Sequence, residues 1–189
     1  MNDLKKHHRI CIFAAVNFKC MKKLLFAAAF AVVGFANAQT DAYRGKGDTR
    51  FQIGANMQDG GTGIVTSLDY GLGESFSIGA QASYLLGVKE IGGFGKPDFG
   101  DRFDIKARFN ANLGSVIGLP QNVDVYPGLN LGLKNFGAHL GGRVFFTKGF
   151  GLFAEAQFPI AKYSDKDKVY NHLNNQFQMN VGVSFDLTK

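Results

Sequence analysis

The stretch RFDIKARFNANL, residues 102–113, alternates apolar and polar side chains without interruption. Successive side chains of a β-strand point to opposite faces, so this pattern predicts a strand with one apolar and one polar face. The pattern leaves open which face is directed outward. A polar outer face is typical of a soluble sheet protein, whereas an apolar outer face requires lipid as the surrounding solvent.

The same alternation recurs along the rest of the chain, and no long helical period follows residue 38. The expected strands are 49–58, 64–72, 76–86, 102–114, 123–133, 136–146, 150–161 and 176–187. Tight turns between them place residues of one face opposite each other in three hairpins: Leu72 with Phe76, Leu133 with Phe136, and Phe146 with Phe150. The sequence therefore predicts an all-β chain, an eight-stranded antiparallel up-and-down β-barrel over residues 49–187.

The residues before the barrel divide into three segments. Residues 21–38, MKKLLFAAAFAVVGFANA, have a basic start, an apolar run and a small-x-small end, which is the pattern of a secretory signal peptide cleaved after Ala38. Its apolar run is shorter than the roughly 20 residues of a spanning helix. We interpret residues 1–20 as a mis-assigned upstream extension with the true start at Met21, the alternative being an extended leader, and residues 39–48 as a polar segment.

Charge and cysteine content exclude several classes of function. The first 38 residues hold six of the 21 Lys and Arg residues and one of the 15 Asp and Glu residues, so the rest of the chain is close to neutral. No basic stripe remains to bind nucleic acid. Both cysteines, Cys11 and Cys20, also precede residue 39, so the barrel has neither a disulfide nor a cysteine metal ligand. We expect no cofactor and no metal.

The order of side chains along the strands favours an apolar outer face. Aromatic residues such as Phe51, Tyr84 and Phe158 concentrate near the strand ends, and aliphatic residues fill the middles. Aromatic girdles on either side of an aliphatic band are typical of transmembrane barrels. The opposite face is rich in Gly, Ser, Asn and Gln, which suit a narrow interior. The strands are also long enough to span a bilayer when tilted.

On these residues the sequence resembles the small eight-stranded outer-membrane barrels of the OmpX and OmpA type, especially the outer membrane β-barrel domain proteins of Bacteroidota. The closing segment FQMNVGVSF is similar to the terminal strand that the barrel-assembly machinery recognises. The resemblance implies a transmembrane barrel in the outer membrane of a Gram-negative cell. Its partners would be outer-membrane lipid and, during biogenesis, the assembly machinery. We expect a monomer with a closed rather than porin-like open lumen. Its role would be structural or loop-mediated recognition at the cell surface, the latter with an extracellular partner that the sequence does not identify.

Charged residues on the polar face form the most concrete candidate site. Since unpaired charge in a narrow lumen is costly, we expect them to form one hydrogen-bonded network, either a structural plug or a proton or ion path. The residues are Arg102, Asp104, Lys106, Arg108, Asp124, His139, Arg143 and Glu155, with Asp69 and Asp186 as further acids.

Two other classes of function remain as alternatives. His139 with a nearby Ser or Asp could indicate an outer-membrane lipid-modifying enzyme, but no Ser lies in a nucleophile turn, and we expect no enzyme. A secreted soluble, lipocalin-like binder of an apolar ligand would show the same alternation with inverted faces. A candidate surface site lies in the connection 87–101, where Phe94 and Phe99 stand among polar residues as a possible anchor for a partner, or turn back to the membrane interface.

Overall fold

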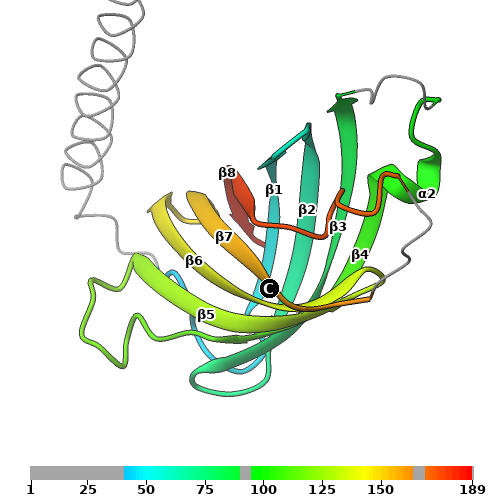
Figure 1. The fold of residues 1–189 in the computed structure, drawn as a ribbon. Helices are drawn as coiled ribbons and strands as arrows, with labels where there is room; N and C mark the ends of the chain where they lie inside the picture. The colour runs from blue at the N-terminus through cyan, green and yellow to red at the C-terminus, as the bar shows by residue number, and fades with distance from the viewer. Residues whose placement is uncertain (1–40, 90–94, 164–168, 189) are drawn as a thin grey trace, which may run out of the picture. The chain divides into compact units, whose positions relative to one another are not determined.

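The computed structural model describes residues 41–89, 95–163 and 169–188, and these form one sheet that closes on itself (Figure 1). The strands are β1 (Thr49–Gln58), β2 (Gly61–Gly71), β3 (Phe76–Val88), β4 (Phe103–Ala111), β5 (Val123–Gly132), β6 (Asn135–Thr147), β7 (Phe150–Lys162) and β8 (Gln178–Asp186). A short helix, α2 (Phe99–Arg102), precedes β4. No helix among the described residues is long and apolar enough to cross a membrane.

Each strand pairs with its neighbours in sequence, and every pair is antiparallel. The first and last strands complete the ring, with register from Arg50 opposite Asp186 to Gln58 opposite Gln178. The predicted eight-stranded, antiparallel, up-and-down β-barrel is therefore confirmed. The segments assigned to an upstream extension and a signal peptide, residues 1–38, lie outside the described residues.

The connections gather at two ends of the barrel. The terminal end carries the segment 41–48, the connections 72–75, 112–122 and 148–149, and residues 187–188. The loop end carries the connections 59–60, 89–98, 133–134 and 163–177. The two longest connections of the loop end are the ones that were expected to be long.

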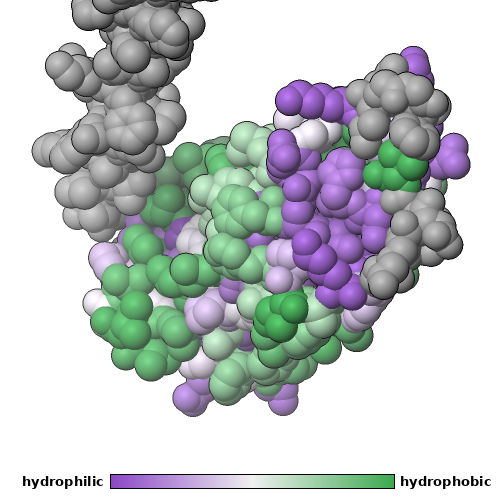
Figure 2. All heavy atoms as spheres, viewed as in Figure 1, coloured by the Kyte–Doolittle hydropathy of each residue, from purple (hydrophilic) through white to green (hydrophobic). Residues whose placement is uncertain are grey.

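The polar face of the strands points into the barrel and the apolar face points out. Buried polar side chains come from alternate positions of every strand, as in β4, where Asp104, Lys106, Arg108 and Asn110 are all buried. The apolar residues between them, including Ile105 and Phe109, are exposed. Figure 2 shows hydrophobic residues spread over the strands, while hydrophilic residues gather towards the loop end beside α2.

Aromatic side chains of the outer face form clusters at both ends. At the terminal end, Phe185 packs against Phe51 and Phe150, with ring centroids 6.3 and 5.7 Å apart, and Phe76 stacks on Phe109 at 5.6 Å. At the loop end, Phe158 lies 5.2 Å from Phe177. The expected sorting of aromatic rings to the two strand ends is present in the structure.

The strand boundaries differ from expectation where the chain leaves regular alternation. β2 begins at Gly61 rather than residue 64, because a bulge between Thr62 and Gly63 keeps a glycine-rich segment in the ladder. The β5–β6 turn is Leu133-Lys134, so Leu131 rather than Leu133 lies opposite Phe136. The expected pairing was wrong by two residues, a slip that leaves the same residues on the same face.

Close packing inside the barrel depends on glycine opposite large side chains. Tyr126 of β5 lies directly across the ladder from Gly141 of β6, and the ring covers that glycine. A Cβ atom added at Gly141 would lie 2.2 Å from two ring atoms of Tyr126. The neighbouring Gly142 faces outward, and its nearest atom would be the carbonyl oxygen of Asp124 at 3.8 Å.

We expect Gly141→Ala to destabilise the barrel by roughly 1–3 kcal/mol, because the extra methyl group overpacks a filled interior. Gly142→Ala is the matched control, since its methyl group meets only ordinary contact distances. Denaturant unfolding in detergent, followed by the mobility shift of the unheated barrel on a gel, measures the difference. Equal stability of the two variants would show that the Tyr126 ring is not held against β6.

Candidate functional site

Seven of the eight predicted network residues lie inside the barrel. Asp104, Lys106, Arg108, Asp124, His139, Arg143 and Glu155 are all buried. They come from β4, β5, β6 and β7, so residues distant in the sequence meet within one narrow lumen. The network is continuous only in part, and it divides into three groups along the barrel.

The central group is built on Arg108. Its guanidinium Nη2 donates to Oε2 of Glu155 at 2.6 Å, and its Nε lies 3.1 Å from Oδ1 of Asp69. Nη1 donates to Oε1 of Gln81 at 3.0 Å. One arginine therefore neutralises two carboxylates from opposite parts of the wall, which ties β2, β3 and β7 to β4 through a single side chain.

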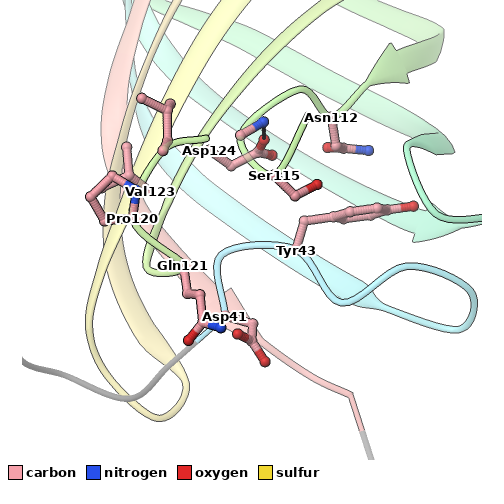
Figure 3. Close-up of a pocket in the computed structure, with 10 residues that line it drawn as sticks. Asp41, Tyr43, Asn112, Ser115, Pro120, Gln121, Val123 and Asp124 are labelled. Carbon is pink, nitrogen blue, oxygen red and sulfur yellow. Dashed lines mark hydrogen bonds between the residues drawn. The ribbon is translucent and has the colours of Figure 1, made fainter. Parts of the chain in front are cut away.

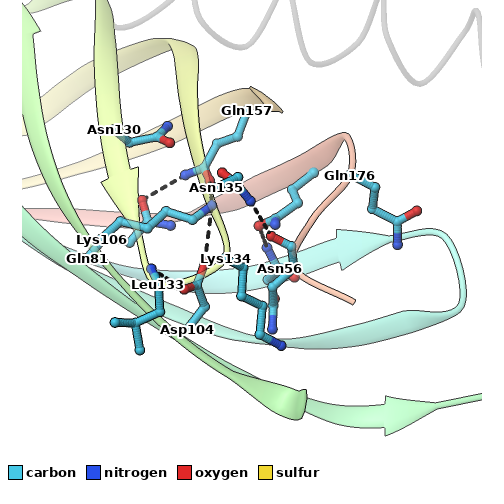
Figure 4. Close-up of polar contacts among 12 residues, drawn as sticks. Asn56, Gln81, Asp104, Lys106, Asn130, Leu133, Lys134, Asn135, Gln157 and Gln176 are labelled. Carbon is cyan, nitrogen blue, oxygen red and sulfur yellow. Dashed lines mark hydrogen bonds and ion pairs between the residues drawn. The ribbon is translucent and has the colours of Figure 1, made fainter. Parts of the chain in front are cut away.

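The second group lies between the centre and the loop end (Figure 4). The ammonium group of Lys106 donates to Oε1 of Gln157 at 2.7 Å and lies 3.7 Å from Oδ2 of Asp104. Gln157 in turn donates to Gln81 and to Glu155, each at 2.7 Å. These amides connect the Lys106 pair to the Arg108 group, so the two predicted bases share one hydrogen-bonded chain.

The third group lies towards the terminal end. Nη2 of Arg143 is 2.7 Å from Oδ2 of Asp124 and 2.7 Å from Oδ1 of Asn112. The guanidinium carbon lies 4.9 Å from the ring centroid of Tyr126, a cation–π distance. Tyr126 also lies 5.9 Å from the guanidinium carbon of Arg108. Its ring therefore separates two buried arginines that would otherwise repel each other.

His139 is held by amide side chains. Its Nε2 lies 2.7 Å from Oδ1 of Asn110, and its Nδ1 lies 3.4 Å from Nδ2 of Asn130. Both contacts are satisfied when Nε2 carries the proton. The arrangement positions a neutral imidazole between two strands, and it does not have the acid–histidine–serine order that nucleophilic catalysis uses.

Arg102 is the one predicted network residue that does not belong to the lumen group, and the expectation was wrong for it. Arg102 ends α2 instead of starting a strand, and its Nε donates to the carbonyl oxygen of Pro97 at 3.2 Å. The helical turn forms because the amide of Asp98 is capped by Oδ2 of Asp101 at 3.1 Å. A two-residue period cannot distinguish one such turn from the first residue of the strand that follows.

The terminal end is closed by ion pairs to the segment 41–48. Arg50 pairs with Asp48 at 2.7 Å and with Asp186 at 3.1 Å, and Asp186 also pairs with Arg44 at 2.5 Å. The guanidinium carbon of Arg50 lies 4.7 Å from the ring centroid of Phe145. The backbone of the segment is bound as well, since the amide of Gly47 donates to Gly71 and the amide of Ala42 donates to Gln121. The segment is thereby fixed across the end of the barrel.

A cavity of about 180 Å³ lies between this segment and the connection 112–122 (Figure 3). Its lining includes Asp41, Tyr43, Asn112, Ser115 and Asp124. The hydroxyl of Tyr43 lies 2.8 Å from the carbonyl oxygen of Gly73 and 2.7 Å from that of Phe76, and can donate to one of them at a time. Burial and the nearby carboxylate of Asp48 raise the pKa of Tyr43 to about 12.

Amide side chains connect the described residues of the loop end. Asn174 donates to the carbonyl oxygen of Arg102 at 3.0 Å and accepts from Nε2 of Gln58 at 3.0 Å. Asn135 donates to the carbonyl oxygen of Asn174 at 2.8 Å. Beside them Leu173 is fully buried against Leu85 and Tyr170. The described part of the connection 163–177 therefore covers the mouth of the lumen.

Of the candidate surface residues, Phe94 lies outside the described residues and Phe99 is 65% exposed. The ring of Phe99 lies 5.4 Å from that of Tyr84 and 5.4 Å from that of Phe103. Phe99, Tyr84 and Phe103 thus form an aromatic cluster at the loop end. This placement favours the second of the two roles considered for Phe99, a return to the outer surface of the strands.

No group of three or more His, Cys, Asp or Glu residues that could hold a metal ion occurs in the described parts of the chain. The carboxylates of the lumen instead have arginine or lysine partners.

The model of a family of unknown function, DUF6646, matches residues 32–187. The chain belongs to this family. Comparison with curated proteins finds no match. The DUF6646 match covers all eight strands and most of the closing segments, so the lumen groups described above fall within the family region.

Several residues that organise this DUF6646 barrel were not predicted as site residues from the sequence. Tyr126 and Phe145 are aromatic residues on the inner face, and Arg50 lies on the inner face of β1. Their inward orientation could have been predicted, since each of them occupies an inward-facing position in the alternating pattern of a predicted strand. The contribution of the segment 41–48 carried no such signal, because it lies outside any alternating pattern.

We expect Arg108→Met to destabilise the barrel by roughly 3–5 kcal/mol, because it leaves Asp69 and Glu155 buried without their common cation. Arg102→Met is the matched control, because this arginine lies at the loop end and bonds to a backbone carbonyl. Denaturant unfolding of both variants in detergent measures the difference. If the two variants lose the same stability, the Arg108 group is not the centre of the network.

We expect the phenol of Tyr43 to ionise only at strongly alkaline pH. Its pKa is raised in the folded state, so its contribution to stability is complete below pH 10, the ordinary tyrosine value, and is lost as the pH rises from about 10 to about 12. Tyr43→Phe should remove that part of the pH dependence and one of the phenolate titrations seen by ultraviolet absorbance. Loss of a phenolate titration near pH 10, rather than near pH 12, in Tyr43→Phe would show that Tyr43 is open to solvent.

Proposed function

We propose that this protein is an integral barrel of the Gram-negative outer membrane, delivered by a signal peptide cleaved after Ala38. The observation that carries the proposal is the polarity of the barrel, whose outer surface is apolar and whose interior is polar and charged. In water such an arrangement would expose a wide apolar surface and bury many ionised groups, both of which are unfavourable. In a bilayer the same arrangement buries the apolar surface in lipid.

Two further features support this setting. The ring of strands has no free edge, so every strand can satisfy its backbone groups within the sheet, which lipid requires. The aromatic clusters lie at the two ends of the outer face, where the bilayer interfaces would be. A soluble lipocalin-like binder would need an apolar interior, whereas the described interior is filled with polar side chains.

The resemblance to OmpX- and OmpA-like barrels suggests a closed monomer rather than a porin-like channel. In support, Arg108, Glu155 and Gln157 meet across the lumen, the segment 41–48 covers the terminal end, and Leu173 and Asn174 cover the loop end. The role of such a barrel is structural or is carried by its loops. The loop end would face the cell exterior, since it carries the longest connection, 163–177, and β1 starts at the other end.

Membrane fractionation of cells that express the full chain tests the location. We expect the mature protein in the outer-membrane fraction, shortened at the signal peptide site, with a gel mobility that changes on heating. Recovery in the soluble periplasmic fraction would contradict the proposal.

We expect Ala80→Arg to destabilise the protein in lipid vesicles by roughly 2–4 kcal/mol, because Ala80 lies at the middle of β3 on the outer face. Glu74→Arg, in the exposed β2–β3 turn, is the matched control and should cost much less. Urea unfolding from vesicles measures both. A soluble barrel would tolerate an exposed arginine at either position, so equal stability would argue against a lipid-facing β3.

A further inference from the structure

The β4–β5 connection differs from the rest of the terminal end in charge and exposure. Residues 113–122, LGSVIGLPQN, contain no charged side chain. Every other connection of this end does, with Glu74 in one turn, Lys148 in another, and four charged residues in the segment 41–48. At the tip of the β4–β5 connection, Val116 is 63% exposed and Ile117 is 58% exposed. An apolar, uncharged tip therefore stands among charged neighbours.

The tip is an ordered turn. The amide of Ile117 donates to the carbonyl oxygen of Leu113 at 3.0 Å, and the amide of Leu119 donates to that of Gly114 at 2.8 Å. Gly118 adopts a positive φ of 72°, which closes the turn. The base is tied to the barrel, since the amide of Gly114 donates to Oδ1 of Asp124 at 2.9 Å. The backbone thus holds Val116 and Ile117 outward, and their exposure does not arise from an unfolded loop.

The tip continues the apolar outer face of the barrel. Leu113 follows Phe109 and Ala111 on the outward positions of β4, and the chain re-enters the outer face at Val123 and Val125 of β5. Figure 1 shows the connection standing away from the strands beside the start of β5. The apolar surface that the strands present to lipid is therefore extended, without a charged residue between, onto the tip.

We propose that Val116 and Ile117 enter the lipid leaflet next to the terminal end, so that residues 113–120 act as an interfacial anchor of the barrel. This inference rests on the proposed membrane location. Lipid is the occupant that fits, because a bilayer accepts a small apolar protrusion without shape complementarity. A stable protein interface buries about 800 Å² on each partner, far more than two aliphatic side chains offer. An anchor at this end fixes the depth and tilt of a barrel.

A single introduced tryptophan can serve as a fluorescent probe of the tip, because the chain contains no tryptophan of its own. We would place a single tryptophan by Ile117→Trp and refold the mature chain into phosphatidylcholine vesicles, with or without bromine on the acyl chains. Bromine quenches indole fluorescence at short range. We expect a blue-shifted emission that loses most of its intensity in the brominated vesicles.

Two further single-tryptophan variants serve as controls. Leu140→Trp, on the outer face of β6, reports a position in contact with lipid and should be quenched. Lys148→Trp, in the exposed β6–β7 turn of the same end, should emit as in water and remain unquenched. Quenching at 117 and 140 but not at 148 is the expected result.

The other outcomes distinguish the interfacial anchor from the proposed membrane location. Quenching at 140 without quenching at 117 would overturn the anchor and leave the membrane barrel standing. Absence of quenching at both positions in a folded protein would overturn the proposed membrane location as well. An emission at 117 that shifts to the blue with protein concentration, and is unaffected by bromine, would assign the tip to contact with a second copy and would also overturn the anchor.

Discussion

The pairing of β1 with β8 is the constraint on which the rest of the structure depends. Without it, the eight strands would form an open sheet with two free edges, and a free edge is a template for further pairing. At the centre of this seam Gly54 lies opposite Gly182. A Cβ atom at Gly182 would lie 2.2 Å from the carbonyl oxygen of Ile53. The absence of side chains at this pair lets the two strands meet, and closure then divides every strand into an inner and an outer face.

Closure also explains why the interior can hold so many ionised groups. Each buried charge of the lumen faces wall positions on several strands, so one guanidinium reaches partners that an open sheet would keep apart. Arg108 contacts Glu155, Asp69 and Gln81 from three different strands. Breaking the contact to Glu155 or to Asp69 would leave that carboxylate buried without its cation, and this penalty exceeds the net gain of forming the pair. The network therefore disfavours alternative registers of strand pairing more than it adds to the free energy of unfolding.

Much of this fold was accessible from the sequence because it follows a single period. The alternation fixed the number of strands, their antiparallel order and the identity of the inward residues Asp104, Lys106 and Arg108. The alternation gave wrong strand boundaries where another local interaction replaced the hydrogen bonds between strands. Asp98 and Asp101 cap a helical turn that removes Arg102 from β4, and the β5–β6 turn is shifted by one residue at Leu133. Contacts between distant segments, such as Tyr43 with Gly73, had no local pattern to reveal them.

The ion pairs that close the terminal end of the barrel have a physical consequence. At the terminal end, Arg44 and Arg50 converge on Asp186, so closure depends on charge and responds to pH and salt. At the loop end, the described contacts include the neutral amides of Asn174 and Gln58, the buried Leu173, and the ammonium group of Lys134, which donates to the carbonyl oxygen of Asp101. Acid or high salt should therefore loosen the hold of the segment 41–48 on the terminal end of the barrel.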